Sequence, residues 1–168
     1  MTTFNLRTLK LRSGEQFVAE KEIALEPLVF GGERYLPVPA TAAAELSVTR
    51  ASTGTVFALR FRARLHGPCH RCLDDAVLDV PISAREYEAT NPDSEELRTP
   101  YLQDDRLDLS AWARDAVALD LPDQILCRPD CAGLCAVCGK NLNTEPHTHD
   151  EEQADSRWAA LAELRHRL

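Results

Sequence analysis

Six cysteines in three close pairs are the residues of this chain best suited to chemistry. The pairs are Cys69-His-Arg-Cys72, Cys127-Arg-Pro-Asp-Cys131 and Cys135-Ala-Val-Cys138, and the last pair is followed by Gly139, His147 and His149. Two residues between cysteines allow a tight turn to aim both sulfur atoms at one tetrahedral ion, and a following glycine tolerates the positive φ that such a turn often needs. Thiolate sulfur with imidazole nitrogen suits zinc. The spacing therefore predicts a zinc-binding protein.

Eight potential ligands are enough for one or two four-coordinate zinc ions. The preferred grouping has a local site formed by Cys135, Cys138, His147 and His149. It has a second site, joining distant parts of the chain, formed by Cys69, Cys72, Cys127 and Cys131. Two alternatives stay open: one ion held by the first and third cysteine pairs, or one ion held by the four cysteines between residues 127 and 138. For the two histidines, a solvated acidic tail is the competing interpretation.

Disulfides and redox catalysis are the other interpretations of the cysteines. The first ten residues lack the continuous apolar stretch of a secretion signal, so we expect a cytoplasmic protein, in which disulfides are rare. A redox Cys-x-x-Cys motif normally opens a helix in a βαβ unit, which lowers the thiol pKa. Here the first pair lies between two strand patterns, so a structural metal in a non-catalytic protein is favoured over a Cys-x-x-Cys redox protein.

The residues on either side of the first cysteine pair alternate as in β-strands. Apolar side chains recur at period two before it, at Phe57, Leu59, Phe61, Ala63 and Leu65, and again after it, at Leu78, Val80 and Ile82. The pattern predicts a strand, a metal-binding turn and a returning strand. The opposite face of the first strand carries Arg60, Arg62 and Arg64. This row is either a solvated outer face or a docking surface for RNA phosphates or an acidic protein.

Two helices are predicted in the second half of the chain. One covers residues 109–119, capped by Asp108 or Ser110 and ended by Pro122, with a buried stripe of Leu109, Trp112, Ala113, Ala116 and Leu119. The other begins near Asp155 and has Trp158, Leu161, Leu164 and Leu168 on one face. The resulting fold class is α+β, with an antiparallel β-rich body over residues 1–126. Residues 127–168 then form a zinc-binding segment and a C-terminal helix that packs on the body.

Composition and charge limit the classes of partner. The chain has 168 residues, 44% hydrophobic and 27% charged, as in a globular protein, and no apolar run is long enough to cross a membrane. Residues 1–65 hold nine Lys/Arg and six Asp/Glu, whereas residues 66–168 hold ten and 21. Because an acidic surface repels phosphate, RNA contact is expected in the first part, and a basic protein would suit the second. No small-molecule substrate is evident.

The motifs from residue 69 onward resemble those of the YceD family. The resemblance rests on Cys69-His-Arg-Cys72, on the stretch Gly133-Leu-Cys-x-x-Cys-Gly-x-Asn-Leu-Asn143, and on Asp155-Ser-Arg-Trp158. It implies a role in large ribosomal subunit assembly and ribosomal RNA accumulation, without known catalysis. The implied partners are pre-large-subunit particles, reached through ribosomal RNA or a basic ribosomal protein. Relatives that carry cysteines at the positions of His147 and His149 favour these histidines as ligands. A zinc-ribbon adaptor in transcription is the alternative function.

Overall fold

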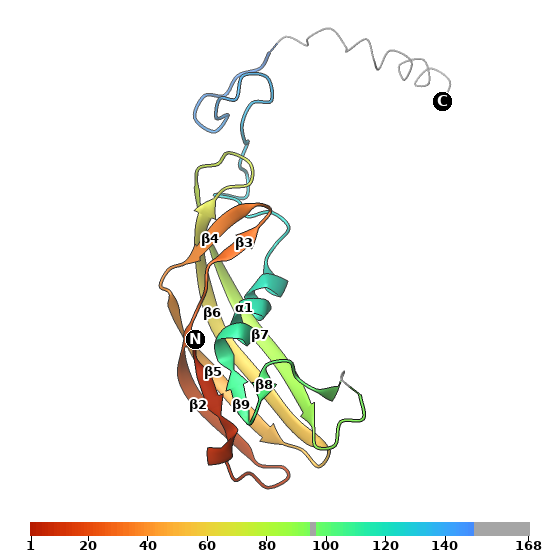
Figure 1. Cartoon of the computed structure of the whole chain (residues 1–168). Coiled ribbons are helices and arrows are strands. Elements are labelled where there is room, and N and C mark those ends of the chain that lie inside the picture. The colour runs from red at the N-terminus through yellow and green to blue at the C-terminus, as the bar shows by residue number, and fades with distance from the viewer. Residues whose placement is uncertain (95–96, 150–168) are drawn as a thin grey trace, which may run out of the picture.

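The computed structural model of the chain describes residues 1–94 and 97–149. Its main element is a six-stranded antiparallel sheet built around the long strand β6. Strand β7 pairs with one edge of β6. The opposite edge pairs with β5, which in turn pairs with β2, and farther along with β4, which in turn pairs with β3. The strands are β2 (Gln16–Ala24), β3 (Leu28–Phe30), β4 (Glu33–Pro37), β5 (Thr41–Arg50), β6 (Gly54–Pro68) and β7 (Asp75–Ala89). Figure 1 shows β6 and β7 running most of the length of the molecule.

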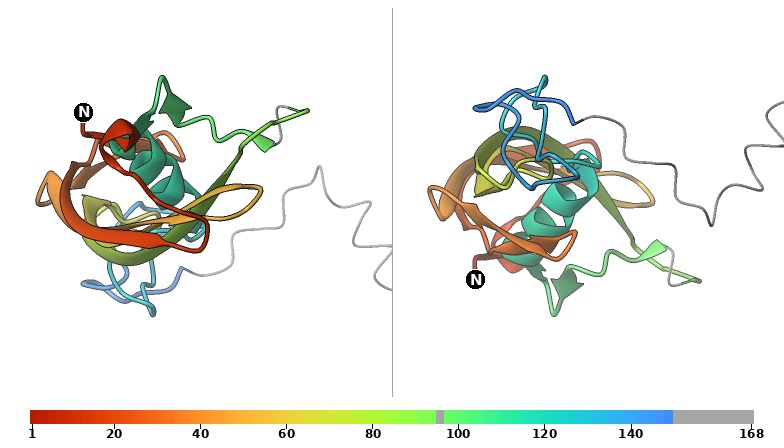
Figure 2. Two further views of the ribbon diagram at one scale, coloured as in Figure 1. Left: turned by 90° about the horizontal axis from the view of Figure 1, so that it is seen from below. Right: turned by 90° about the horizontal axis from the view of Figure 1, so that it is seen from above.

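The hydrophobic core lies between the concave face of this sheet and the one α-helix found in the described residues. All five apolar residues predicted to face the core from β6 are buried: Phe57, Leu59, Phe61, Ala63 and Leu65. The sheet curls around one side of α1 (Leu109–Asp120), as the views along the molecule show (Figure 2). Burying one such side chain stabilises a fold by about 1.5–3 kcal/mol. The alternation in the sequence therefore sets which face of the sheet meets the helix.

Helix α1 begins and ends close to the predicted positions. The Asp108 carboxylate accepts from the N–H groups of Ser110 and Ala111, both at 3.1 Å, so it caps the helix. The prediction that Leu119 belongs to the buried stripe is wrong, because its side chain is 86% exposed, and Val117 is buried instead. At 3.6 residues per turn, Leu119 lies roughly a quarter-turn from the centre of the stripe, at its edge and in the last turn of the helix.

A small second sheet ties the start of the chain to α1. It has the order β1-β9-β8, with β1 (Thr3–Asn5), β8 (Leu102–Gln103) and β9 (Arg106–Asp108), and a short 3-10 helix, η1 (Leu6–Thr8), follows β1. The carbonyl of Thr2 accepts from the N–H of Leu109 at 2.9 Å, at the first turn of the helix.

The predicted fold class, an antiparallel β-rich protein with a cysteine-rich segment and a helix at 109–119, is confirmed. The second predicted helix, from Asp155, and its docking on the body lie outside the described residues. The division of the chain at residue 126 stays a prediction. Among the residues that the structure describes, no helix is long and apolar enough to cross a membrane.

Candidate metal centre

The first cysteine pair forms the turn between β6 and β7. We call residues 69–74 the first knuckle. The N–H of Leu73 donates to the carbonyl of Cys69 at 3.0 Å, and the N–H of Cys69 donates to the carbonyl of Asp74 at 2.7 Å. Leu73 has φ +63°, the left-handed conformation that lets the chain reverse directly after the second cysteine. Two long paired strands thus fix the position of Cys69 and Cys72.

The third cysteine pair forms a turn with the same backbone hydrogen bonds. In the second knuckle, residues 135–140, the N–H of Gly139 donates to the carbonyl of Cys135 and the N–H of Cys135 donates to that of Lys140, both at 2.8 Å. Gly139 has φ +72°, as the predicted role of this glycine requires. The two knuckles are therefore equivalent turns, each aiming two sulfur atoms to the same side.

Four cysteine sulfur atoms meet beneath the first knuckle. This buried four-cysteine group consists of Cys69, Cys72, Cys127 and Cys131, whose sulfurs all lie within 4.8 Å of one another. The Sγ atoms of Cys69 and Cys131 are 3.8 Å apart, and those of Cys72 and Cys127 are 3.6 Å apart. A disulfide would need about 2.05 Å, whereas four sulfurs around a tetrahedral zinc, each at about 2.3 Å, lie about 3.8 Å apart. The spacing fits a metal and excludes disulfides within the group.

Electrostatics favour thiolate at two of these cysteines and thiol at the other two. Burial raises the pKa of Cys69, but the backbone N–H groups of Cys72, Cys127 and Arg71 outweigh it and bring that pKa to about 6. The side-chain amide of Asn143 lowers the pKa of Cys131. Burial raises the pKa of Cys72 and of Cys127. A bound dication supplies the positive charge that allows all four to be thiolates together.

A second, more exposed group combines two cysteines with two histidines. This mixed group consists of Cys135, Cys138, His147 and His149, with ligand atoms all within 4.8 Å of one another. The Cys138 Sγ and the Nε2 of His147 are 3.1 Å apart. The Nδ1 of His147 lies 2.7 Å from the carbonyl oxygen of Glu145, to which it can donate, leaving Nε2 free as a ligand. Backbone N–H groups of Cys138 and Val137 lower the pKa of Cys135 to about 6.

The two groups coincide with the preferred grouping from the sequence. Within the described residues, the ligand atoms do not assemble in either alternative way, with the first and third pairs together or with the four cysteines between 127 and 138 together. The donor sets, four sulfurs in one group and two sulfurs with two nitrogens in the other, are those of structural zinc sites. That the eight residues bind zinc stays a prediction.

Sequence reasoning did not identify the polar residues that support the buried group. Asn143 donates from its side-chain amide to the Cys131 sulfur at 3.4 Å, and Asn141 donates to the carboxylate of Asp74 at 2.6 Å. The spacing Gly139-x-Asn141-x-Asn143, directly after the second knuckle, is the sequence signal that could have indicated them. Outer-shell hydrogen bonds of this kind orient metal ligands.

The three arginines predicted as a partner face lie exposed on the outer face of β6. Arg60 is 3.5 Å from Glu45 and Arg64 is 3.9 Å from Asp79, whereas Arg62 has no carboxylate within 4 Å among the described residues. A groove of about 520 Å³ opens beside them, where β5 diverges from β6. Its lining includes all three arginines together with Pro39, Thr41, Ala42 and Ala43.

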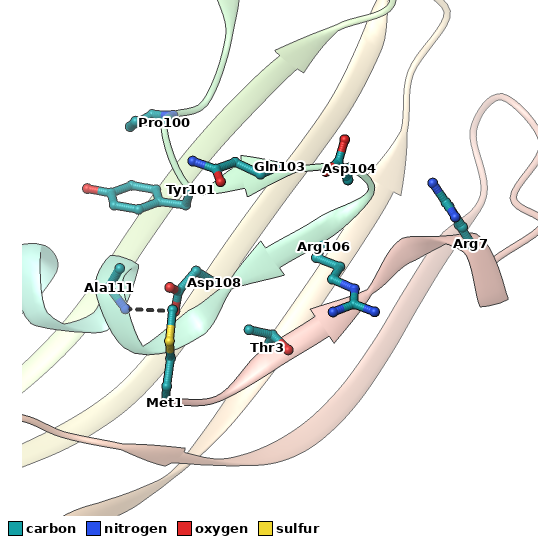
Figure 3. Close-up of a pocket in the computed structure, with 10 residues that line it drawn as sticks. All are labelled: Met1, Thr3, Arg7, Pro100, Tyr101, Gln103, Asp104, Arg106, Asp108 and Ala111. Carbon is teal, nitrogen blue, oxygen red and sulfur yellow. Dashed lines mark hydrogen bonds between the residues drawn. The ribbon is translucent and has the colours of Figure 1, made fainter.

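Another pocket, of about 680 Å³, lies at the small sheet (Figure 3). Its lining contains arginine, aspartate and glutamine side chains but neither histidine nor cysteine. Two of its polar groups already have structural partners: Asp108 caps α1, the contact dashed in the figure, and Arg7 is 2.9 Å from Asp105. The pocket therefore lies apart from the metal-ligand groups.

Comparison with known proteins places these features in a family. The sequence model of the YceD family, described as large ribosomal RNA subunit accumulation protein YceD, matches residues 57–165. Proteins described as uncharacterized from Mycobacterium tuberculosis and Mycobacterium bovis are 38% identical over 125 residues, which cover 71% of this chain and 60% of each relative. A maize protein named as a chloroplastic YCED homolog, a large ribosomal RNA subunit accumulation protein, is 44% identical over 41 residues, covering 24% of this chain and 14% of its own.

The match thus spans about 60% of the length of the mycobacterial relatives. No solved structure matches the chain. The family model covers more than half of the chain, including both knuckles and every predicted metal ligand. The chain therefore belongs to the YceD family.

Proposed function

We propose that this protein is a non-catalytic, zinc-stabilised factor that supports the accumulation of large-subunit ribosomal RNA in the cytoplasm. The family description carries the ribosomal part of the proposal. The two sets of four ligand atoms support the zinc part.

The donor sets favour a structural rather than a catalytic role for zinc. Each group offers four protein ligands, so a tetrahedral ion held by all four would have no open position for a substrate or a reactive water. Zinc supplies positive charge that holds the ligands together. Such closure contributes on the order of 10 kcal/mol in zinc-finger peptides at neutral pH. The buried group would tie the β6–β7 turn to residues 127–131, and the mixed group would close the segment up to His149.

The groove beside β6 is the proposed contact with RNA. Arg62 is free of carboxylates within the described chain, and the carboxylates near Arg60 and Arg64 form exposed ion pairs, each of which contributes only about 0–1 kcal/mol. An RNA phosphate can therefore replace these carboxylates at little cost in free energy. Guanidinium groups also bind phosphate with paired hydrogen bonds. The excess of Asp and Glu in the sequence from residue 66 onward would suit a basic ribosomal protein as a further partner.

A depletion and rescue experiment tests the function. Cells depleted of the protein should show a lower ratio of large-subunit to small-subunit ribosomal RNA, and the protein should co-sediment with pre-large-subunit particles in sucrose gradients. The wild-type chain should restore the ratio, whereas a Cys72→Ser/Cys131→Ser chain, expressed to the same level, should not. An unchanged ratio on depletion would contradict the ribosomal role.

A further inference from the structure

The segment that leaves the second knuckle also supports the buried four-cysteine group. Asn143 lies three residues beyond this knuckle, and its amide donates to the Cys131 sulfur at 3.4 Å. The oxygen of the same amide accepts from the N–H of Ala132 at 2.8 Å and from the Arg128 guanidinium at 2.7 Å. The Asn143 side chain thus contacts both Cys131, a ligand of the buried four-cysteine group, and the loop that carries Cys131.

Asn141 joins the closing residues of the two knuckles. Its amide donates to Asp74, which closes the first knuckle, and Asn141 itself directly follows Lys140, which closes the second. Its side-chain oxygen accepts from both the backbone N–H and the side-chain amide of Asn143, each at 2.9 Å. A further link is the N–H of Leu134, which donates to the carbonyl of Arg71 inside the first knuckle at 3.1 Å.

The same short turn positions a ligand of the mixed group. The carbonyl of Asn141 accepts from the N–H groups of Thr144 and Glu145, at 3.2 and 2.9 Å, so the chain reverses there. Glu145 then receives the ring N–H of His147 on its carbonyl oxygen at 2.7 Å, and its carboxylate lies 2.7 Å from the ammonium of Lys140. Residues 141–145 therefore contact the buried group at one end and orient His147 at the other.

From this arrangement we infer that the two metal sites are coupled, and that Asn141 and Asn143 are the positioning residues that couple them. The inference rests on the proposed zinc binding. An ion in the mixed group fixes both the second knuckle and His147, and so it fixes the turn between them. The fixed turn presents the Asn143 amide to Cys131 and the Asn141 amide to Asp74. Filling the mixed site therefore raises the affinity of the buried site for its ion. Filling the buried site raises the affinity of the mixed site by the same factor.

The inference can be tested with cobalt(II), whose absorption differs between four-sulfur and two-sulfur, two-nitrogen sites. The full chain is compared with a His147→Ala/His149→Ala variant, which keeps both knuckles but loses the nitrogen ligands of the mixed group. Competition with a chelator should show that the four-sulfur site binds cobalt about fivefold or more weakly in this variant. With Asn141→Ala/Asn143→Ala in both chains, this difference should fall below about twofold, as expected when the coupling is lost.

An Asn91→Ala background is the matched control, because Asn91 is an exposed asparagine far along the chain from either knuckle. It should leave the fivefold difference unchanged. If the double asparagine variant fails to fold, as judged by circular dichroism, Asn143→Asp replaces it, since this change keeps the size of the side chain and exchanges the amide N–H that donates to Cys131 and to Asn141 for a carboxylate oxygen. Equal affinities with and without the histidines, or a difference that survives the asparagine changes, would overturn the coupling. A wild-type chain that binds no metal would instead overturn the proposed zinc binding itself.

Discussion

Leu73 and Gly139 occupy the same position in two equivalent turns, yet one carries a branched side chain and the other none. Both have positive φ, +63° and +72°. A non-glycine residue in this conformation costs roughly 1–2 kcal/mol, a cost that the first knuckle already tolerates between two long paired strands. The second knuckle does not lie between long paired strands, so its glycine matters more for local order.

Gly133 is a third position with positive φ, +79°, and it differs from Gly139 in its surroundings. A Cβ on Gly139 would have nothing within 4 Å, whereas a Cβ on Gly133 would lie 3.2 Å from the carbonyl oxygen of Arg71. We expect Gly139→Ala to lower the free energy of unfolding of the zinc-loaded chain by about 1 kcal/mol. Gly133→Ala should lower it further, because it also separates the two knuckles. Urea unfolding of both variants checks this order, and equal losses would contradict it.

Arg62 carries the residue-scale prediction for RNA contact. Replacing it by alanine should weaken binding to large-subunit ribosomal RNA and reduce the slope of log affinity against log salt by about 0.7–0.9, the share of one phosphate contact. Arg12→Ala is the matched control, since Arg12 is exposed and lies outside the groove. Binding measured at several salt concentrations distinguishes the two. An equal effect of both changes would indicate only general attraction.

At the scale of elements, α1 depends on its cap at Asp108. Its carboxylate satisfies two N–H groups of the first turn, so Asp108→Ala should lower the free energy of unfolding by about 1 kcal/mol. Asp120→Ala, at the other end of α1, is the control. A negative charge there opposes the helix dipole, so its removal should be neutral or slightly stabilising. Denaturant titration of the two variants tests this, and a larger loss at Asp120 would contradict it.

The sequence predicted some elements well because their signals are local. The alternation from Phe57 to Leu65 marked β6 and its buried face, and the polar cap and apolar spacing marked α1. The short strand β8 was missed because two residues in a polar stretch are too few to show an alternating pattern, although its partner β9 follows directly after the turn at Asp104 and Asp105. The pairing of β9 with β1 joins the two ends of a long stretch of chain and leaves no periodic pattern either.

In the candidate site, too, the features that depend on local sequence were predicted and those that depend on distant contacts were not. Cysteine spacing predicted the two knuckles, because each is a local turn, whereas the grouping of the ligands was one preferred choice among three and became clear only with the fold. The support from Asn141 and Asn143 was not predictable in the same way, because it depends on contacts with Asp74 and Cys131, residues from another part of the chain. Asparagine beside a turn commonly caps the local backbone, so its long-range role became visible only with the fold.

At the scale of the whole molecule, the buried four-cysteine group adjoins one end of the hydrophobic core, which includes Cys69, Cys72 and Cys131. The mixed group lies outside that core. Figure 1 places residues 127–149 at one end, beyond the strands, whereas α1 packs on the sheet along its middle. Most of the largest buried side chains, among them Trp112, Phe57 and Leu46, come from the sheets and α1, and none comes from residues 127–149. Burial of this core does not require an ion, because it excludes water from apolar surface on its own.

Removing the metal should therefore affect one end of the molecule and leave the rest folded. With a strong zinc chelator, amide hydrogen exchange should speed up in residues 69–74 and 127–145, whose positions depend on the ligands. Exchange should change little in the central parts of β5 and β6, which pair with each other and bury Leu46 and Leu59. Cys135→Ser provides a finer comparison, since it removes one ligand of the mixed group and should expose residues 135–145 more than residues 69–74. If the chelator exposed every segment together, the metal would be holding the whole fold, and if it exposed none, the eight ligand residues would not be holding the chain by means of an ion.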